Sequence, residues 1–250
     1  MTERELAVKR FIELARKSEH GYFTFTDFLG LAEQSAFREA AREIGKTRYT
    51  LFGGAEGTER IMVRFGDPEE LGYTQPHPIS ILKISPRSEK YAEKLTHRSY
   101  LGATLNLGIE REVIGDIVVR HPYAYLFCKE DIAEYIKDNL TRVSHTDVFV
   151  EIIDNLPEGE LYKTELCRVQ TVGERLDAII AKLYHLSRDD ANALFKKSLV
   201  FAEGREITNN SYIPKIGETI SVRTLGRFQY LGPKGTTRSG RLSIELSVYV

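Results

Sequence analysis

Apolar and polar positions near the start of the chain follow a helical period. Residues 3–18 and 30–44 each carry apolar side chains about one turn apart, which predicts two amphipathic helices. Gly45 is expected to end the second helix. Two β-prone runs, residues 49–52 and 61–65, flank a glycine cluster and predict a hairpin. The chain therefore begins with an N-terminal α/β block.

The glycine cluster Gly53-Gly54-Ala55-Glu56-Gly57 could be a turn or a phosphate cradle. No Gly-Lys-Ser/Thr follows it, so a turn is the favoured interpretation. Further on, Pro76-His77-Pro78 continues neither a helix nor a strand ladder. We therefore expect residues 1–75 to form the first domain.

The pattern changes period repeatedly in the middle of the chain and predicts six elements. In order they are a strand (79–84), a helix (88–105), two strands (113–120 and 123–128), a helix (130–141) and a strand (147–153). The order βαββαβ is that of a ferredoxin-like sandwich, the fold of RNA-recognition motifs. Many domains of this fold never contact RNA. We expect this RRM-like domain to span residues 76–158 in a chain of α+β class.

Three aromatic residues, Tyr123, Tyr125 and Phe127, alternate along one predicted strand of this domain. Alternation sends all three side chains to one face of the sheet. On an open face they could stack on bases, whereas on a covered face they would be ordinary core. The sequence leaves both interpretations open.

Two capping boxes predict two short helices in the last third of the chain, residues 165–250. Thr171 followed by Glu174 predicts the start of one helix, with Leu176 in its buried stripe. Ser187 followed by Asp190 predicts the start of the next.

Each of these helices should expose a polar row of regular spacing. Arg175 and Lys182 are seven residues apart on the first helix, and Arg188, Asn192 and Lys196 are four apart on the second. A cationic face on a rigid unit suits phosphate contact, because each neutralised phosphate releases condensed counterions. A merely solvated helix face fits the same spacing.

Charge is distributed unevenly along the chain. Residues 166–250 hold 13 Lys and Arg against 8 Asp and Glu, a balance of +5, whereas residues 1–165 hold 22 against 28, a balance of −6. A basic end on an acidic body favours a polyanionic partner for that end.

Several classes of protein are disfavoured by composition. No run approaches the roughly 20 apolar residues of a membrane span, and the first residues lack the pattern of a secretory signal. Cys128 and Cys167 stand apart, without a zinc-ligand spacing, and are expected to be reduced thiols. We therefore expect a cytoplasmic protein with no membrane association, no metal and no cofactor.

The C-terminal block resembles the S4 domain in a series of motifs at its spacing. They are Arg175-Leu176-Asp177, Leu186-Ser187-Arg188, Ala191, Lys196-Lys197, Val200, Gly204-Arg205, Ser211-Tyr212, Lys215-Ile216-Gly217-Glu218 and Ile220. The resemblance implies two helices that lead into a small twisted sheet and grip RNA with the helical face. It implies RNA contacts for Arg175, Ser187, Arg188, Lys196 and Lys197. Asn192, from the helix spacing, and Arg205, from the matched Gly204-Arg205 motif, are further candidates. Ser198, Ala202-Glu203 and Glu218 depart from the usual S4 residues, and Ser198 stands where glycine is common.

The whole chain resembles the bacterial YlmH family. The most distinctive motif is Leu95-Thr96-His97-Arg98-x-Tyr100-Leu101-Gly102-Ala103-x-Leu105-Asn106-Leu107-Gly108-Ile109, followed by Ile114-Gly115-Asp116-Ile117. This resemblance implies RNA binding on large ribosomal subunits that carry stalled peptidyl-tRNA, and genes that neighbour cell-division loci. The expected partners are therefore rRNA or tRNA and the large subunit, bound by a monomer.

Residues 232–241 predict a Gly- and Pro-marked loop between two strands. Its cations, Lys234, Arg238 and Arg241, could wrap a phosphate backbone or simply occupy an exposed hairpin tip.

Catalytic patterns are missing from the sequence. The six histidines are scattered, and no nucleophile elbow or dinucleotide fingerprint occurs. We therefore expect no catalytic residues and a non-enzymatic RNA-binding factor in translation quality control. An RNA-modifying enzyme of the pseudouridine-synthase kind and a cell-division interaction factor stay open as alternatives.

Overall fold

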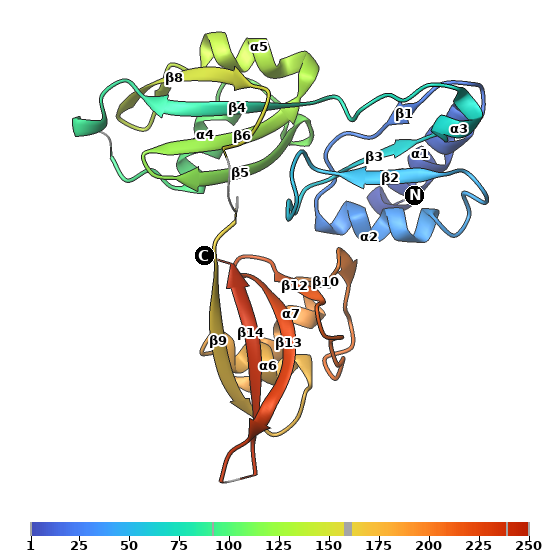
Figure 1. Ribbon diagram of the computed structural model, residues 1–250. Coiled ribbons are helices and arrows are strands. Elements are labelled where there is room, and N and C mark those ends of the chain that lie inside the picture. Colours follow the sequence, from blue (N-terminus) through green and yellow to red (C-terminus); the bar gives the residue numbers. More distant parts are fainter. Residues whose placement is uncertain (1, 92, 158–161, 239, 250) are drawn as a thin grey trace. The chain divides into compact units, whose positions relative to one another are not determined.

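The structure is a computed structural model that describes residues 2–91, 93–157, 162–238 and 240–249. The chain folds into two compact units, Met1–Leu161 and Tyr162–Val250 (Figure 1). Helices and antiparallel sheets occur in both units, so the α+β class predicted from the sequence is confirmed.

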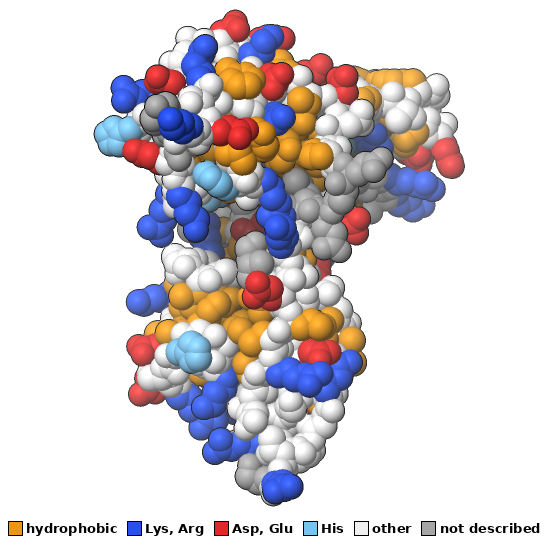
Figure 2. Space-filling model, turned by 60° about the vertical axis from the view of Figure 1, so that its left-hand side comes forward, with side chains coloured by type: hydrophobic (Ala, Val, Ile, Leu, Met, Phe, Trp, Pro, Cys, Tyr) orange, Lys and Arg blue, Asp and Glu red, His pale blue; other side chains and the backbone are white. Residues whose placement is uncertain are grey.

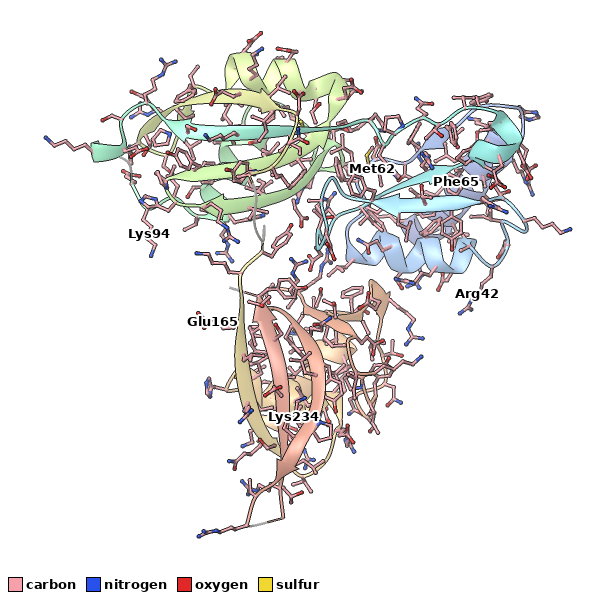
Figure 3. All side chains as sticks on the ribbon, in the orientation of Figure 1. Arg42, Met62, Phe65, Lys94, Glu165 and Lys234 are labelled. Carbon is pink, nitrogen blue, oxygen red and sulfur yellow. The ribbon has the colours of Figure 1, made fainter. Side chains whose placement is uncertain are left out.

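The first 75 residues of the first unit place two helices against a three-stranded sheet of order β1-β3-β2. Phe11 of α1 and Phe37 of α2 meet edge to face and share a core with Phe65 of β3. Figure 3 labels Met62 and Phe65 at the two ends of β3, and both side chains are completely buried. The elements are α1 (Glu3–Ser18), β1 (Thr24–Phe25), α2 (Leu31–Ala40), β2 (Tyr49–Phe52), β3 (Met62–Phe65) and α3 (Pro68–Leu71).

The helix predicted over residues 30–44 ends four residues early, at Ala40. The N–H groups of Arg42 and Glu43 bond to carbonyls three residues back, so the chain tightens into turns up to Gly45. Gly45 itself has a left-handed φ of 74°, which a glycine adopts without steric cost. The prediction that Gly45 ends the helix is therefore wrong, and the glycine lies within the turns that follow it.

The middle of the chain forms the ferredoxin-like domain that its pattern predicts. Its sheet has the order β5-β6-β4-β8-β7, and α4 and α5 contribute Tyr100 and Ile136 to a core with Leu82 and Leu126 of the sheet. The elements are β4 (Ile79–Pro86), η1 (Glu89–Tyr91), α4 (His97–Leu105), η2 (Arg111–Val113), β5 (Ile114–Arg120), β6 (Tyr123–Lys129), α5 (Glu130–Asn139), β7 (Arg142–Val143) and β8 (Thr146–Ile153).

The single helix predicted over residues 88–105 is wrong in its first half. A 3-10 turn comes first, and α4 begins only at His97, after a capping box formed by Thr96 and Ser99. The Ser99 N–H donates to the Thr96 hydroxyl at 3.4 Å, and the Thr96 N–H donates to the Ser99 hydroxyl at 3.2 Å. A cap that satisfies the free N–H groups fixes the start of the helix there.

The second unit packs two helices on a six-stranded antiparallel sheet of order β11-β10-β12-β13-β14-β9 (Figure 1). Leu176 and Ile180 of α6 and Phe195 of α7 share its core with Phe228 and Leu246 of the sheet. Two helices leading into a small sheet is the arrangement that the S4 resemblance implies. The elements are β9 (Thr164–Thr171), α6 (Leu176–Leu183), α7 (Arg188–Lys196), β10 (Val200–Ala202), β11 (Arg205–Glu206), β12 (Thr219–Val222), β13 (Gly226–Thr236) and β14 (Leu242–Tyr249).

Two local predictions fail in this unit. Thr171 does not cap a helix, because it is the last residue of β9 and pairs with Leu242 of β14. Glu174 accepts a hydrogen bond from the hydroxyl of Tyr230 instead of closing a capping box. The loop predicted over residues 232–241 is also shorter, because β13 continues to Thr236 with irregular register.

A network around Arg60 joins the N-terminal block to the central sheet. The Arg60 guanidinium donates to the carbonyls of Ile114 at 2.9 Å, Phe28 at 2.7 Å and Arg111 at 3.3 Å. The carboxylate of Asp116 accepts from the backbone N–H groups of Glu59 and Arg60, at 2.7 and 2.9 Å. Burial lowers the pKa of Arg60, and burial followed by the nearby Arg60 charge lowers the pKa of Arg111 to about 10.

We predict that Arg60→Met destabilises the first unit by about 2–3 kcal/mol, because several buried carbonyls lose their donor at once. Alkylation of Cys128 in urea reports the loss, since burial raises the pKa of this thiol to about 12 and keeps it unreactive until the core opens. The exposed control Arg42→Met should stay within about 0.5 kcal/mol of the unaltered protein. Equal urea midpoints for both variants would contradict a structural role for Arg60.

Candidate functional site

The helical pair α6–α7 begins its second helix at a side-chain cap. The Ser187 hydroxyl accepts from the Asp190 N–H at 3.1 Å and donates to the Asp190 carboxylate at 2.6 Å. An oxygen cap satisfies one of the free N–H groups of a first helical turn. The predicted helix start at Ser187 is therefore confirmed, and its hydroxyl is engaged in holding the helix.

Three cations of α7 and its end face solvent. Arg188, Lys196 and Lys197 are exposed, and none of them forms an ion pair with a residue that the structure describes. Arg188 and Lys196 lie two turns apart with Asn192 between them, so the three share one side of the helix. Unpaired cations on one side of a rigid helix are suited to contact consecutive phosphates.

The helix α7 ends in a left-handed turn at Ser198, where the resemblance led us to expect glycine. Ser198 has a φ of 54°. The N–H groups of Ser198 and Leu199 bond to the carbonyls of Phe195 and Leu194, which is the pattern of a Schellman motif. The serine thus keeps the turn, at a conformational cost of about 1–2 kcal/mol.

Arg175 is placed differently from the α7 cations. Its guanidinium makes two hydrogen bonds, of 3.1 and 2.8 Å, to the carboxylate of Asp177, which is only 1% exposed. The hydrogen bond that Arg175 donates to the Asp177 carboxylate raises the pKa of Arg175. Arg175 therefore compensates a buried charge, and only the remaining donors of its exposed side chain can reach a ligand.

The loop at residues 209–212 is hydrogen-bonded to both helices, α6 and α7. The N–H groups of Leu176 and Asp177, at the start of α6, donate to the carbonyls of Tyr212 and Asn210 at 2.8 and 3.2 Å. The side-chain amide of Asn210 donates to Asn192 of α7 at 2.9 Å. The same loop therefore fixes the start of α6 and the middle of α7, and Asn192 has a structural partner.

Arg205 approaches the same loop through Tyr212. Its guanidinium carbon lies 5.7 Å from the centre of the Tyr212 ring, and one of its nitrogens is 3.4 Å from the Tyr212 hydroxyl. Burial, then the hydrogen bond to Glu218, raises the pKa of Tyr212. Asn210 and Tyr212 were not among the expected site residues, because loop residues without a period give no signal of the contacts they make.

The three cations expected on the C-terminal hairpin have different surroundings in the structure. Lys234 of β13, labelled in Figure 3, lies 3.7 Å from the carboxylate of Glu245. Arg241 lines a pocket together with Arg188 and Lys182. Arg238 lies between β13 and β14 and takes no part in that pocket. On the C-terminal unit, Figure 2 shows Lys and Arg side chains gathered below a band of hydrophobic ones.

The aromatic face of the central sheet is largely closed. Leu126 and Cys128 belong to the core under the helices, so Tyr123, Tyr125 and Phe127 point to the opposite face. Tyr125 and Phe127 are buried on that face. At Gly54 an added Cβ would lie 2.4 Å from the Phe127 ring, so the N-terminal block covers this ring.

Phe127 is therefore core and is closed to base stacking. Tyr123 remains half-buried, with Lys83 lying 4.6 Å over its ring and its hydroxyl donating to Glu89 at 2.9 Å.

No helix in the described parts of the chain is both long and apolar enough to cross a membrane. Within the same parts, no group of three or more His, Cys, Asp or Glu side chains is placed to hold a metal ion. Cys128 and Cys167 are both free thiols.

Comparison with known proteins adds to this geometry. Residues 74–156 match the family described as "Putative RNA-binding domain in YlmH". The chain is 28% identical over 228 residues to the "Ribosome-associated protein quality control protein P2" of Bacillus subtilis, covering 86% of this chain and 83% of the relative. Among solved structures, the "Cell division protein ylmH" of Streptococcus pneumoniae matches with 26% identity and a TM-score of 0.48, over 61% of this chain and 92% of that one.

The central domain matches an RNA-binding family, and the C-terminal unit has a basic helical surface. This chain is therefore in the class of RNA-binding proteins. More particularly, residues 74–156 match the RNA-binding domain of the YlmH family, and the chain is similar over most of its length to a ribosome-associated quality control protein.

We predict that Arg175→Glu loosens the start of α6, because it places a second negative charge beside the buried carboxylate of Asp177. Hydrogen exchange of the amides of residues 176–183 should become faster in this variant. The same substitution at the unpaired, exposed Arg188 should leave the exchange unchanged. Slow exchange in both variants would mean that Arg175 is free for ligands and does not support the fold.

Proposed function

We propose that this protein is an S4-type RNA-binding factor that holds structured RNA through the exposed side of α7 and its surroundings. The observation that carries the proposal is the set of unpaired cations Arg188, Lys196 and Lys197 on a helix of fixed geometry. In double-stranded RNA the accessible features are backbone shape, phosphates and 2′-hydroxyls. Long cationic side chains of this kind contact them without reading base identity.

The supporting residues around this surface have distinct roles in the proposal. Arg175 and Asn192 hold the two helices through Asp177 and Asn210, and offer their remaining donors to RNA. Arg205, steadied by Tyr212, extends the basic surface along the loop, while Ser187 orients Arg188 by capping α7. Lys234, Arg238 and Arg241 of the C-terminal hairpin add positive charge in the same unit.

We infer a ribosomal target from the relative in Bacillus subtilis, whose name describes a ribosome-associated quality control protein. The RNA would then be rRNA or tRNA, most simply on the large subunit when a stalled peptidyl-tRNA occupies it. A cytoplasmic monomer that binds and does not catalyse is sufficient for this role. Residues 1–165 carry an acidic balance, so the phosphate-binding surface proposed here lies in the basic C-terminal unit.

We predict that the double variant Arg188→Glu and Lys196→Glu weakens binding to large ribosomal subunits and to tRNA, whatever the sequence of the RNA. The slope of log K against log salt is negative, and each lost phosphate contact should reduce its magnitude by about 0.9. The slope of the double variant should therefore be smaller in magnitude by about 1.8. Fluorescence anisotropy over a series of salt concentrations measures both the affinity and the slope.

A matched control carries Lys163→Glu and Arg223→Glu, which change the net charge equally at exposed positions outside the helices. This control should bind with nearly the original slope. Full binding by the Arg188 and Lys196 variant, or an equal loss in both double variants, would contradict the proposed surface.

A further inference from the structure

A pocket of about 290 Å³ opens beside the proposed RNA-binding surface, wholly within the C-terminal unit. Its wall is mainly apolar, its rim carries cations, and it combines the end of β9, the second half of α6 and the start of α7. The lining residues are Gln170, Thr171, Val172, Ala178, Ala181, Lys182, Leu186, Arg188 and Arg241. The volume is at the lower end of ligand pockets, which span about 300–1,000 Å³, and suits one flat ring system.

Thr171 belongs to the pocket lining, and its hydroxyl has no hydrogen-bond partner among the described residues. The Thr171 side chain is 3% exposed, its oxygen is buried, and no described group bonds to it. Thr171 lies on the same side of β9 as the core residue Val169. A buried hydroxyl without a partner is costly, by about 1–3 kcal/mol, and such a group points to a ligand that completes it.

Three cations surround the pocket and are free for an anion. Lys182 and Arg188 are exposed, Arg241 is exposed as well, and none of the three has an ion pair within the described chain. Val172, at the rim, is 86% exposed, which is unusual for a large apolar side chain. The pocket therefore offers an apolar slot, one polar group inside it and positive charge around its mouth.

We propose that this pocket receives a single unpaired nucleotide of the bound RNA. The base enters between Val172, Ala181 and Leu186 and meets the Thr171 hydroxyl with a polar edge atom, while Lys182, Arg188 and Arg241 hold the phosphates on either side. A nucleotide is the ligand that joins a flat apolar body, a polar edge and flanking negative charge. This proposal deepens the RNA-binding function and rests on it.

The proposal predicts a preference for bulged RNA. Full-length protein is titrated into two labelled RNA hairpins that are identical except for one bulged nucleotide, prepared with each of the four bases. The bulged hairpins should bind about tenfold more tightly, which is the range of a base taken up by a protein. A 4-thiouridine at the bulge should crosslink to the tryptic peptides 169–175 or 176–182.

Two variants test the pocket without removing its charges. Thr171→Val removes the unpaired hydroxyl, so it should raise the melting temperature slightly while lowering the preference for the bulge several-fold. Ala181→Leu fills the slot and should abolish the preference, with binding to the fully paired hairpin kept within about twofold. Ala193→Leu on α7, outside the pocket lining, is the matched control and should keep the preference.

The outcomes separate the two proposals. Equal binding of bulged and paired hairpins, or a preference that survives both pocket variants, would overturn the nucleotide pocket and leave the phosphate-binding surface intact. Failure to bind either hairpin would overturn both.

Discussion

The buried carboxylate of Asp177 is the constraint on which the basic surface depends. A charge with 1% exposure is tolerated only when it is paired and hydrogen-bonded, and here Arg175 and the N–H of Ala178 supply those bonds. The backbone N–H of Asp177 donates a hydrogen bond to the carbonyl of Asn210, and the side-chain amide of Asn210 donates one to Asn192 of α7. The two helices and the loop at residues 209–212 therefore form one hydrogen-bonded network.

The cations of the C-terminal unit are of two kinds, those with an ion-pair partner and those without one among the described residues. Arg175, Arg168 and Lys234 lie beside carboxylates, so each has an ion-pair partner within the protein, although the side chains stay accessible. Arg188 and Lys196 have no such partner among the described residues and keep their full charge for a ligand. Net charge alone, +5 for residues 166–250, could not separate the cations that hold the fold from those free to bind.

In the first unit a hydrogen-bonded network around Arg60 and Asp116 covers part of the sheet surface instead of supporting an exposed one. Arg60 and Asp116 hold the N-terminal block against the central sheet, and Gly54 lies on the ring of Phe127. RNA-recognition motifs stack bases on this face of their sheet, which here is covered at Phe127. The ferredoxin-like fold is therefore present without that stacking position, so RNA binding by residues 74–156 would not use base stacking at Phe127.

The sequence by itself determined the elements whose signals are local. The helix at residues 3–18, the cap at Ser187 and the βαββαβ order follow from periods and caps that span only a few residues. It also indicated a basic C-terminal unit and a resemblance to the YlmH family. These features need no knowledge of which distant segments meet.

Only the tertiary structure decided which interactions Thr171 and Glu174 make. It also decided that α6 begins at Leu176. Their spacing is that of a capping box. In the structure, however, Thr171 pairs with β14 and Glu174 accepts a hydrogen bond from the hydroxyl of Tyr230. The pocket likewise joins Thr171 and Lys182 to Arg241, which lies much further along the sequence. The physical reason is that strand pairing and burial act between distant residues, and they override local preferences whenever the two compete for the same side chain.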